Sequence, residues 1–593
     1  MGKVSLNDLT SKPGMTGWFD PRLLSKLLLH VIVSGTFGKY ADRRLIHAAL
    51  DQADGKEFLR RADMRGLLKP DQDGAIWIDY VADLGDGFDA TYAIAYLLAQ
   101  EALDVGKYRL PRGQALIMGG DQVYPDASLK DYQGRMLTPY KWAFPDNLAP
   151  DAPHPPVLVI PGNHDWYDGL VLFLALFCKR DDLELGSWRS VQRRSYFAIQ
   201  LTEQWWLWGI DIQLMEDIDQ PQADYFEAIA KEMHDGSNII LCTAVPGWLV
   251  AEKKEKGSFD AMGYAAGITK KAGKELKVPL ILSGDTHHYS RYAYGDIQFI
   301  TAGGGGAFLH GTHQLKDEID AKWWLWPGGD RFRLKTEPDG NHGLSNTAAC
   351  YPTREESREL LLRNLSFYIS NPGFALFLGF IYWIGAMLLT VRPEFDVGVI
   401  IFTALAAGLA GYTAHQEGWT LKVVVASLSH AVAHFAAIVG LTWFFGIVNT
   451  ELFGLQNFYP WMVGALFVEM VPTGAVIGGF IFGVYLLLTC RYFDMNHNDA
   501  FSAIRLDSYR HFLRIRIKDD AVTIYPVAID SVPTRDGWHL NPENAPPASV
   551  FAPRSKLILR LTEGRPIEIR AGEVKSVQEV AKPKAEDEAV KTE

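Results

Sequence analysis

The chain has 593 residues and a formal net charge of −12. That length exceeds one ordinary domain and predicts roughly three or four units. The negative charge argues against a sequence-independent grip on nucleic acid, so we expect no nucleic-acid partner. The cysteines contain no C-x-x-C pair, which excludes a disulfide framework and a zinc–thiolate site. They are Cys178, Cys242, Cys350 and Cys490.

The first 69 residues are predicted to form an amphipathic helical segment. Residues 21–33 are apolar but are interrupted by Arg22, Lys26 and His30. This pattern fits an amphipathic helix better than a cleavable signal.

Residues 70–365 alternate apolar runs with helical patterns, which is typical of an α/β domain. Seven runs are predicted strands: 75–81, 115–118, 157–160, 206–214, 238–242, 280–282 and 297–301.

Four of these strands end in side chains that can bind a metal ion. In chain order they are Asp83 and Asp86, then Asp121 and Tyr124, then Asn163, His164 and Asp165, and last Asp285, His287 and His288. A single Gly-Asp pair is ordinary turn chemistry. Four such turns are different, because α/β sheets hold their sites at the carboxyl ends of strands. Carboxylates with an amide and imidazoles suit Mn, Fe, Mg or Zn, so the set predicts a metal site.

The order of these motifs is D-x-G, G-D-x-x-Y, G-N-H-D and G-x-x-H. It resembles the calcineurin-like metallophosphoesterases and, in detail, their purple acid phosphatase branch. The stretch F-I-T-A-G-G-G-G-A-F at 299–308 resembles the strand and glycine turn that follow in the family. The resemblance covers about residues 70–310. It implies a β-sandwich flanked by helices and a site for two divalent or trivalent metal ions.

The resemblance also implies a role for each residue. Asp83, Asp121, Tyr124 and His287 would hold one metal. Asp121 would bridge to a second metal, which Asn163 would also hold. For Tyr124 two interpretations stay open, a phenolate on ferric iron and a packed tyrosine. The implied catalytic pair is the next two residues, His164 beside the leaving-group oxygen and Asp165 as its orienter.

Two departures from the family pattern affect the second metal. Ala244 stands where the family has a histidine before a proline, and Asp285 replaces the first histidine of G-H-x-H. Three alternatives follow. The site binds a harder metal through oxygen ligands, with Asp285 a ligand and Asp86 or His288 completing the number. It holds one metal tightly and one loosely, or it is catalytically inactive.

The composition changes near residue 366. Four apolar stretches, 367–391, 397–414, 423–447 and 461–488, meet or approach the roughly 20 residues that cross a bilayer. We therefore expect a transmembrane domain of four helices at 366–490. A small β-rich domain should follow at 491–575, and a disordered tail at 576–593.

Basic residues around these stretches predict the orientation. They cluster before the first stretch, between the second and third, and after the fourth: Arg354, Arg358, Arg363, Lys422, Arg491, Arg505, Arg510, Arg514 and Arg516. The two other loops hold only Arg392. This asymmetry predicts a multi-pass protein of a bacterial-type inner membrane with both soluble domains in the cytoplasm.

Other features each allow two interpretations. The apolar run at 170–177 is either a buried helix or a wall that contacts the membrane or an acyl chain. The basic residues Arg189, Arg193 and Arg194 either form a solvated face or bind anionic headgroups or substrate phosphate. His430 and His434 share a helical face and Glu469 lies in the fourth stretch, so they are either a locking cluster or a proton or metal path. The tryptophans at 323–326 suit an interfacial anchor.

The sequence thus predicts a membrane-bound, metal-dependent phosphoesterase that hydrolyses a phosphate mono- or diester. A phospholipid or lipid-linked phosphate is one candidate substrate. The alternative is a membrane sensor or transporter whose phosphatase-like domain binds a phosphorylated ligand without turnover. The oligomeric state is not predicted.

Overall fold

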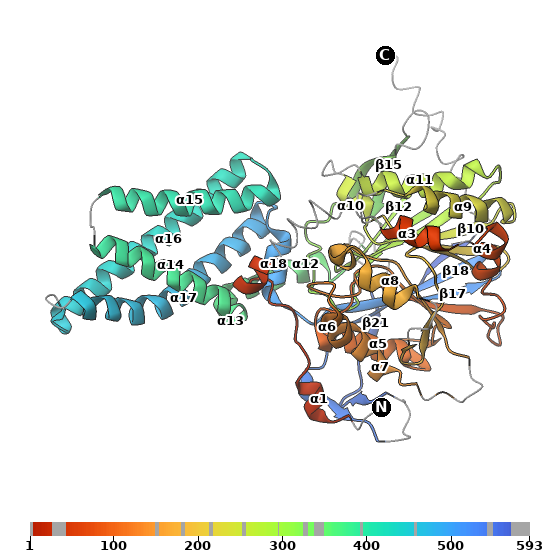
Figure 1. Ribbon diagram of the computed structural model, residues 1–593, viewed down its shortest axis with the longest axis horizontal. Helices are drawn as coiled ribbons and strands as arrows, with labels where there is room; N and C mark the ends of the chain where they lie inside the picture. The colour runs from red at the N-terminus through yellow and green to blue at the C-terminus, as the bar shows by residue number, and fades with distance from the viewer. Residues whose placement is uncertain are drawn as a thin grey trace, which may run out of the picture. The chain divides into compact units, whose positions relative to one another are not determined.

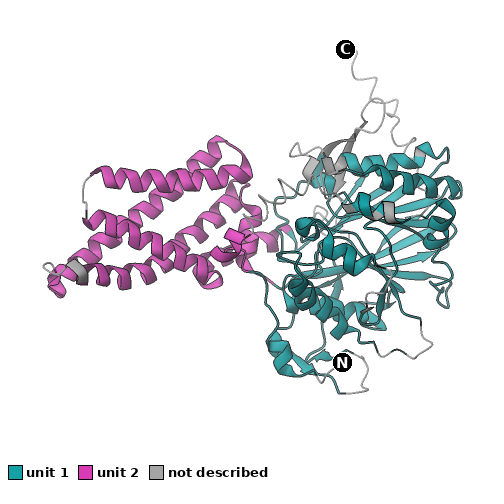
Figure 2. Cartoon of the chain, in the orientation of Figure 1, with its two compact units in different colours: residues 1–16, 31–353, 507–593 teal, residues 17–30, 354–506 magenta. Residues whose placement is uncertain are grey.

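The structure is a computed structural model that describes residues 4–26, 43–51, 53–146, 148, 153–179, 184–212, 217–251, 257–294, 296–323, 330–336, 349–391, 395–455, 459–542 and 549–570. The chain divides into two compact units (Figure 2). Unit 1 contains residues 1–16, 31–353 and 507–593, and unit 2 contains residues 17–30 and 354–506.

Two nine-stranded sheets form the centre of unit 1 (Figure 1). The first contains, in spatial order, β21 (Leu559–Leu561), β18 (Ala521–Ile529), β17 (Arg510–Lys518), β1 (Ile76–Val81), β4 (Ala115–Met118), β5 (Pro156–Val159), β7 (Trp188–Ser190) and β6 (Glu184–Leu185), with β22 (Ile567–Arg570) beside β18. The second contains β14 (Glu318–Trp323), β15 (Asp330–Thr336), β12 (Tyr289–Tyr294), β13 (Ile297–Ala302), β11 (Lys277–Ser283), β10 (Asn238–Thr243), β9 (Trp205–Gly209) and β8 (Phe197–Gln200), with β16 (Cys350–Tyr351) beside β12.

The alternation of side chains along β1 explains the layers of unit 1. Ile78 and Tyr80 join a core between the two sheets, together with residues such as Leu282 of β11. Trp77 and Val81 point to the opposite face, where helices α5 (Phe88–Ala99) and α7 (Thr138–Ala143) pack. Helices α9 (Gln220–Glu232) and α11 (Gly257–Lys271) cover the second sheet (Figure 1). Unit 1 is therefore a stack of helices, two sheets and helices.

All seven predicted strands are present, although the tryptophan-rich strand β9 ends at Gly209. The mixed α/β class is thereby confirmed. Strands β1, β4 and β5 are parallel, as are β9, β10, β11 and β13. Their carboxyl ends carry the predicted site residues.

The structure corrects the expectation of a separate C-terminal β-domain. Strand β17 pairs antiparallel with β1, from Ile76 opposite Ile517 to Tyr80 opposite Leu513. Residues 507–593 accordingly belong to unit 1. The physical reason is that β1 would otherwise be an open edge with an unpaired backbone. The sequence pattern predicts the strands but not their partner.

The first 69 residues also fail to form a segment of their own. Leu9 lies in the core beneath α5, and Phe58 of α4 (Gly55–Ala62) packs against the core of the second sheet. Phe19 belongs to unit 2, where its ring lies 5.2 Å from that of Phe367. The predicted tail at 576–593 and Trp324 and Trp326 lie outside the described residues.

Unit 2 contains four helices that are long and apolar enough to cross a membrane: α14 (Pro372–Val391), α15 (Phe395–Glu417), α16 (Leu421–Ile447) and α17 (Tyr459–Tyr492). Large apolar side chains on their surface are open, with Trp443 70%, Val468 69% and Ile400 64% exposed. Such surface suits lipid rather than water. Helices α14 and α17 approach closely at Gly379, where a Cβ would lie 2.2 Å from the oxygen of Val471. These helices fit a membrane domain.

Candidate functional site

The hydroxyl of Tyr124 is the point where predicted ligands from three strand ends meet. Its oxygen lies 3.2 Å from Oδ1 of Asp83, 2.9 Å from Oδ2 of Asp121 and 2.9 Å from Nε2 of His287. Asp83 follows β1, Asp121 follows β4 and His287 follows β11, so strands of both sheets contribute. All four side chains are buried.

The imidazole of His287 is held in the tautomer that a metal ligand needs. Its Nδ1 lies 2.6 Å from the oxygen of Phe308, and a carbonyl can only accept, so Nδ1 carries the proton. Its Nε2 therefore presents a lone pair to the Tyr124 side. Burial lowers the pKa of His287 well below its ordinary value, which keeps the ring neutral. The ring of His310 stacks on it at 4.1 Å.

Three acidic residues at these strand ends have left-handed backbone conformations. The φ angles are 59° for Asp83, 46° for Asp121 and 65° for Asp285. This region costs L-residues roughly 1–2 kcal/mol, somewhat less for Asp than for most residues. Such outliers cluster at functional sites, where the fold over-determines them. Here the conformation lets the amide of Asp285 donate to Oδ1 of Asp83 at 3.0 Å.

Glycines make room for the carboxylates. A Cβ at Gly303 would lie 2.3 Å from Oδ2 of Asp83, and one at Gly162 would lie 2.0 Å from Oδ1 of Asp121. Within the described residues, Oδ2 of Asp83 and Oδ1 of Asn163 are buried and have no hydrogen-bond partner. A buried oxygen without a partner costs free energy. A cation at these oxygens would remove that cost, so the residues present fit a metal.

The electrostatics agree with this fit. Burial, with the nearby charges of Asp121 and Asp285, raises the pKa of Asp83 well above its ordinary value. Burial raises the pKa of Asp121 to about 6, and it raises that of Tyr124 well above the usual range. Asp83 and Tyr124 therefore favour their protonated forms when no cation compensates them, and Asp121 takes up a proton more readily than an ordinary aspartate. A bound cation would invert this and favour the ionised forms.

The structure brings His164 to the same cluster. Its backbone amide donates to Oδ1 of Asp121 at 2.9 Å, and its ring lies 4.3 Å from that of Tyr124. Its Nδ1 lies 3.0 Å from the oxygen of Pro125. Burial lowers the pKa of this imidazole to about 4.

The structure corrects the role predicted for Asp165, because its carboxylate accepts hydrogen bonds from backbone amides. Its Oδ2 accepts from the amides of Gly162, at 2.9 Å, and Gln122, at 3.2 Å. Its Oδ1 accepts from the hydroxyl of Tyr132 at 2.5 Å. Asp165 thus ties together the loops that follow β4 and β5, and the oxygen of Pro125 holds the ring that we expected it to orient.

The two optional ligands have different surroundings. Asp86 accepts from the amides of Thr16, at 2.8 Å, and Phe308, at 3.2 Å, so both its oxygens hold backbone. His288 is buried, and within the described part of the chain neither ring nitrogen has a hydrogen-bond partner. Ala244 packs in the core between the sheets, so no ligand stands at that position.

Residues that follow the four apolar helices complete the wall of the site, and sequence reasoning missed them. Arg510 donates to the oxygen of Ala307, and the amide of His511 donates to the oxygen of Gly304 at 3.3 Å. Both partners lie in the glycine turn that contacts Asp83. No sequence signal joins positions some 200 residues apart, because β17 reaches this turn only through its pairing with β1.

The apolar run after the site is helix α8 (Val171–Phe177), and most of it is core. Phe173 and Phe177 are fully buried beside α5, whereas Leu172 is partly buried. The interpretation as a buried helix is confirmed for these residues. An exposed acyl wall that includes Phe173 is therefore wrong.

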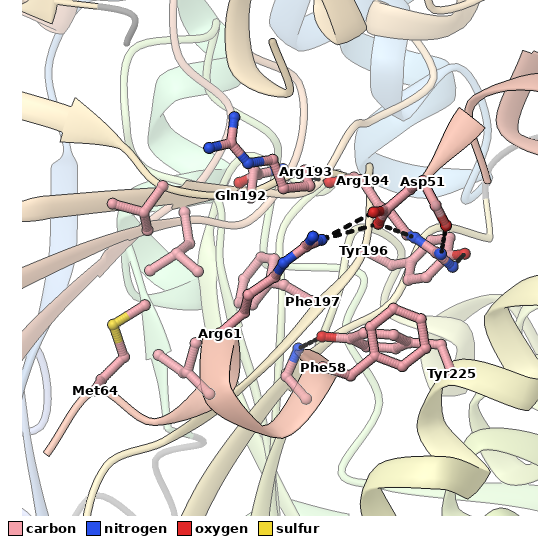
Figure 3. Close-up of a pocket in the computed structure, with 14 residues that line it drawn as sticks. Asp51, Phe58, Arg61, Met64, Gln192, Arg193, Arg194, Tyr196, Phe197 and Tyr225 are labelled. Atoms are coloured by element: carbon pink, nitrogen blue, oxygen red, sulfur yellow. Dashed lines mark hydrogen bonds and ion pairs between the residues drawn. The ribbon is translucent and has the colours of Figure 1, made fainter. Parts of the chain in front are cut away.

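The basic run at 189–194 contributes to a small pocket that contains none of the predicted ligands (Figure 3). Arg194 and Arg61 point toward Asp51, with nitrogen–oxygen distances of 3.1 and 3.0 Å. Arg194 also lies over the ring of Phe58 at 4.9 Å. Its charge is thus paired inside the unit. Arg189 pairs with Asp146 at 2.7 Å.

Comparisons with known proteins give little guidance. No protein-family description matches the sequence, and no curated protein matches it. One solved structure, titled "Structure of PhoD", aligns with 11% identity and a TM-score of 0.26. The alignment covers 40% of this chain and 58% of that one. A likeness this distant carries no argument about fold or activity.

Proposed function

We propose that this protein is a membrane-bound, metal-dependent phosphoesterase that hydrolyses a phosphate mono- or diester. The convergence of Asp83, Asp121 and His287 on the Tyr124 hydroxyl carries the proposal. The order of the four motifs supports it as well, since it resembles that of the calcineurin-like metallophosphoesterases.

The ligands that we assign are these four residues together with Asn163, whose Oδ1 is buried without a partner among the described residues. Asp285 stands where the family has an imidazole, and this shifts the donor set toward oxygen. Oxygen donors favour Mn, Mg or Fe over a softer ion. When bound, a pair of such cations would neutralise a phosphate and lower the pKa of an attacking water.

The remaining steps belong to side chains of this chain. The ring of His164, held by Pro125 and packed beside Tyr124, is the group that we assign to protonate the leaving oxygen. Because burial keeps this ring neutral before substrate binds, Nε2 must first take up a proton, which a bound anionic phosphate would favour. Asp165 acts one step away, because it fixes the loops that carry Asp121 and His164. The left-handed strand ends hold the carboxylates in place before any substrate binds.

The decisive experiment measures bound metal and the hydrolysis of a panel of phosphoesters in detergent. Wild type should contain metal and turn over at least one ester, and Asp121→Asn should lose both. Asp224→Asn, on the surface of α9, is the matched control and should keep both. Metal and activity retained in Asp121→Asn would contradict the ligand assignment. Bound metal without any turnover would favour the alternative of a phosphate-binding sensor, to which Ala244 also points.

His164 separates chemistry from metal binding. His164→Ala should keep its metal and lose roughly 10²–10⁴-fold in rate, the usual contribution of general acid–base catalysis. Metal loss in this variant would make His164 a ligand instead. The same preparations allow a direct comparison with Asp121→Asn.

We propose that the four apolar helices span a bacterial-type inner membrane with unit 1 in the cytoplasm. The basic residues that flank the helices support this orientation. Reporter fusions at the N-terminus and after Arg491 should report cytoplasm, and a fusion near position 457 the opposite side. A periplasmic report from unit 1 would reject the orientation.

We further propose that the substrate is lipid-linked, since a soluble ester requires no membrane anchor. Each buried methylene contributes about 0.8 kcal/mol, so lengthening an acyl chain by two carbons should raise kcat/KM about tenfold. A small chromogenic ester assayed with the same protein is the control. A flat dependence on chain length would reject a lipid substrate and leave hydrolysis itself intact.

A further inference from the structure

We propose that unit 2 carries a proton relay formed by Tyr382, His434 and His430. The proposal depends on the membrane location proposed above and is independent of phosphoester hydrolysis. The sequence left two interpretations open for the histidine pair, a locking cluster and a proton or metal path, and this proposal adopts the proton path.

The three side chains form one unbroken chain of hydrogen bonds. The Tyr382 hydroxyl lies 2.8 Å from Nδ1 of His434, and Nε2 of His434 lies 2.9 Å from Nε2 of His430. All three are at most 3% exposed. The histidines are one turn apart on α16, whereas Tyr382 comes from α14. Gly474 and Gly478 of α17 admit its ring, since a Cβ at either would lie 2.7 or 3.2 Å from Tyr382 atoms.

Each proton that leaves a side chain of this relay is replaced by another. In one arrangement Tyr382 donates to Nδ1 of His434, Nε2–H of His434 donates to Nε2 of His430, and Nδ1 of His430 carries a proton. When water takes that last proton, the Nε2 proton of His434 moves to His430 and the Tyr382 proton moves to His434. Tyr382 then takes a proton from water on its other side. One proton has crossed, and each bond broken is replaced by one formed.

The His430 end of the relay explains an otherwise costly feature. Within the described residues, Nδ1 of His430 is buried and has no hydrogen-bond partner. In a cluster that only locks α14 to α16, this unpaired nitrogen would lower stability and have no function. In a relay it is the terminus. Two nitrogens alone also make a poor metal site, which usually has at least three protein ligands.

A polar group continues from this terminus toward the end of α15. The ring of Tyr485 stacks on His430 with centroids 4.0 Å apart. Its hydroxyl lies 2.8 Å from Oγ1 of Thr413 and 3.2 Å from Nδ2 of Asn496. The backbone N–H of Asn496 donates to Oε1 of Glu417 at 2.7 Å, so this side ends in a carboxylate.

An apolar layer closes the other end. Ala386 and Ile438 lie one turn beyond Tyr382 and His434 on their helices, and they are fully buried. They form one cluster with Tyr382, Leu466 and Met470. Water must pass this layer to reach Tyr382, so its opening is the expected slow step.

An ionisable residue comes one position before a member of this layer in the sequence. Glu469 adjoins Met470 on α17 and accepts from Nδ2 of Asn449 at 2.9 Å. Ionisable groups at such depth in membrane helices are rare and mark ion or proton pathways. We assign Glu469 as the entrance. The sequence interpretation grouped Glu469 with His430 and His434, whereas in the structure its side chain bonds to Asn449.

The test uses the full-length protein in lipid vesicles, after flotation has shown that it is inserted. A potassium gradient with valinomycin drives protons, and an entrapped pH dye reports them. Wild type should exceed protein-free vesicles, and His434→Gln should lower the flux about tenfold or more, because an amide cannot pass a proton. His415→Gln, exposed on α15, is the matched control and should equal wild type.

A second variant and an NMR measurement test the relay independently of His434→Gln. Tyr382→Phe keeps the packed ring and removes only the hydroxyl, so it should also lower the flux if His434→Gln does not fold. In wild type with ¹⁵N-histidine, NMR should show an N–H···N coupling between the two Nε2 atoms. The proposal is overturned by wild-type flux equal to that of empty vesicles, by wild-type flux in a folded His434→Gln, or by absence of the coupling. Failed flotation would instead reject the membrane location.

Discussion

Gly303→Ala tests the metal site through a residue that ligates nothing. A Cβ at this position would lie 2.3 Å from Oδ2 of Asp83 and 2.6 Å from the oxygen of Thr286. Ordinary contacts begin near 3.4 Å, so the carboxylate or the backbone must retreat by about 1 Å. A misplacement of that size costs up to about 100-fold in rate. Overpacking itself costs roughly 1–3 kcal/mol of stability.

The assay combines manganese titration, metal content and thermal unfolding in the same detergent. We expect metal affinity to fall about 10–100-fold, as when a ligand loses its support. Gly267→Ala on α11 is the matched control, because nothing lies within 4 Å of its Cβ position. It should bind metal normally and gain roughly 0.5–1 kcal/mol from helix propensity. Wild-type affinity and unfolding in Gly303→Ala would refute the argument that Asp83 is held against a cation.

Three other outcomes follow from the contacts. Arg514→Met should lower the free energy of unfolding, measured by chemical denaturation, by about 3–5 kcal/mol, because Asp79 stays buried and loses the hydrogen bonds of 2.8 and 3.0 Å from Arg514. The control Arg516→Met on the same strand should lower it by less than about 1 kcal/mol. Chelation should lower the unfolding temperature, because metal at 100 times its Kd stabilises by about 2.7 kcal/mol; an unchanged temperature would argue against a structural cation. Tyr132→Phe removes a hydrogen bond to Asp165 and should lower the free energy of unfolding by about 1–3 kcal/mol while the protein retains its metal; metal loss would show that metal binding depends on the Tyr132–Asp165 contact.

Much of unit 1 could be predicted because local patterns determine it. The seven strands are short apolar runs bounded by turn residues, and the polar residues after four of them follow from the chemistry of strand ends. Asp83, Asp121 and Tyr124 meet because the parallel strands β1 and β4 bring their carboxyl ends together. His287 reaches them from β11 because the two sheets are stacked, so strand order alone anticipates only the first part of the site.

What could not be predicted depends on contacts between distant segments. The role of Asp165 was wrong because adjacency to His164 suggested a side-chain partner, whereas the tight turn directs its carboxylate at backbone amides. The fate of Phe173 depended on which face α5 covers. The pairing of β17 with β1 joins residues more than 430 positions apart, a separation that no periodicity encodes.

That pairing has a consequence for how the site comes to exist. Unit 1 is discontinuous, because residues 354–506 interrupt it. Until β17 is made, β1 has an open edge and Asp79 lacks Arg514, so the strand that ends in Asp83 is incompletely supported. The glycine turn likewise lacks His511, which occupies the space beside Gly304. The ligands themselves all precede residue 354, but their supporting contacts are complete only after the four apolar helices have been synthesised, which ties the assembly of the proposed catalytic site to a chain that already contains these helices.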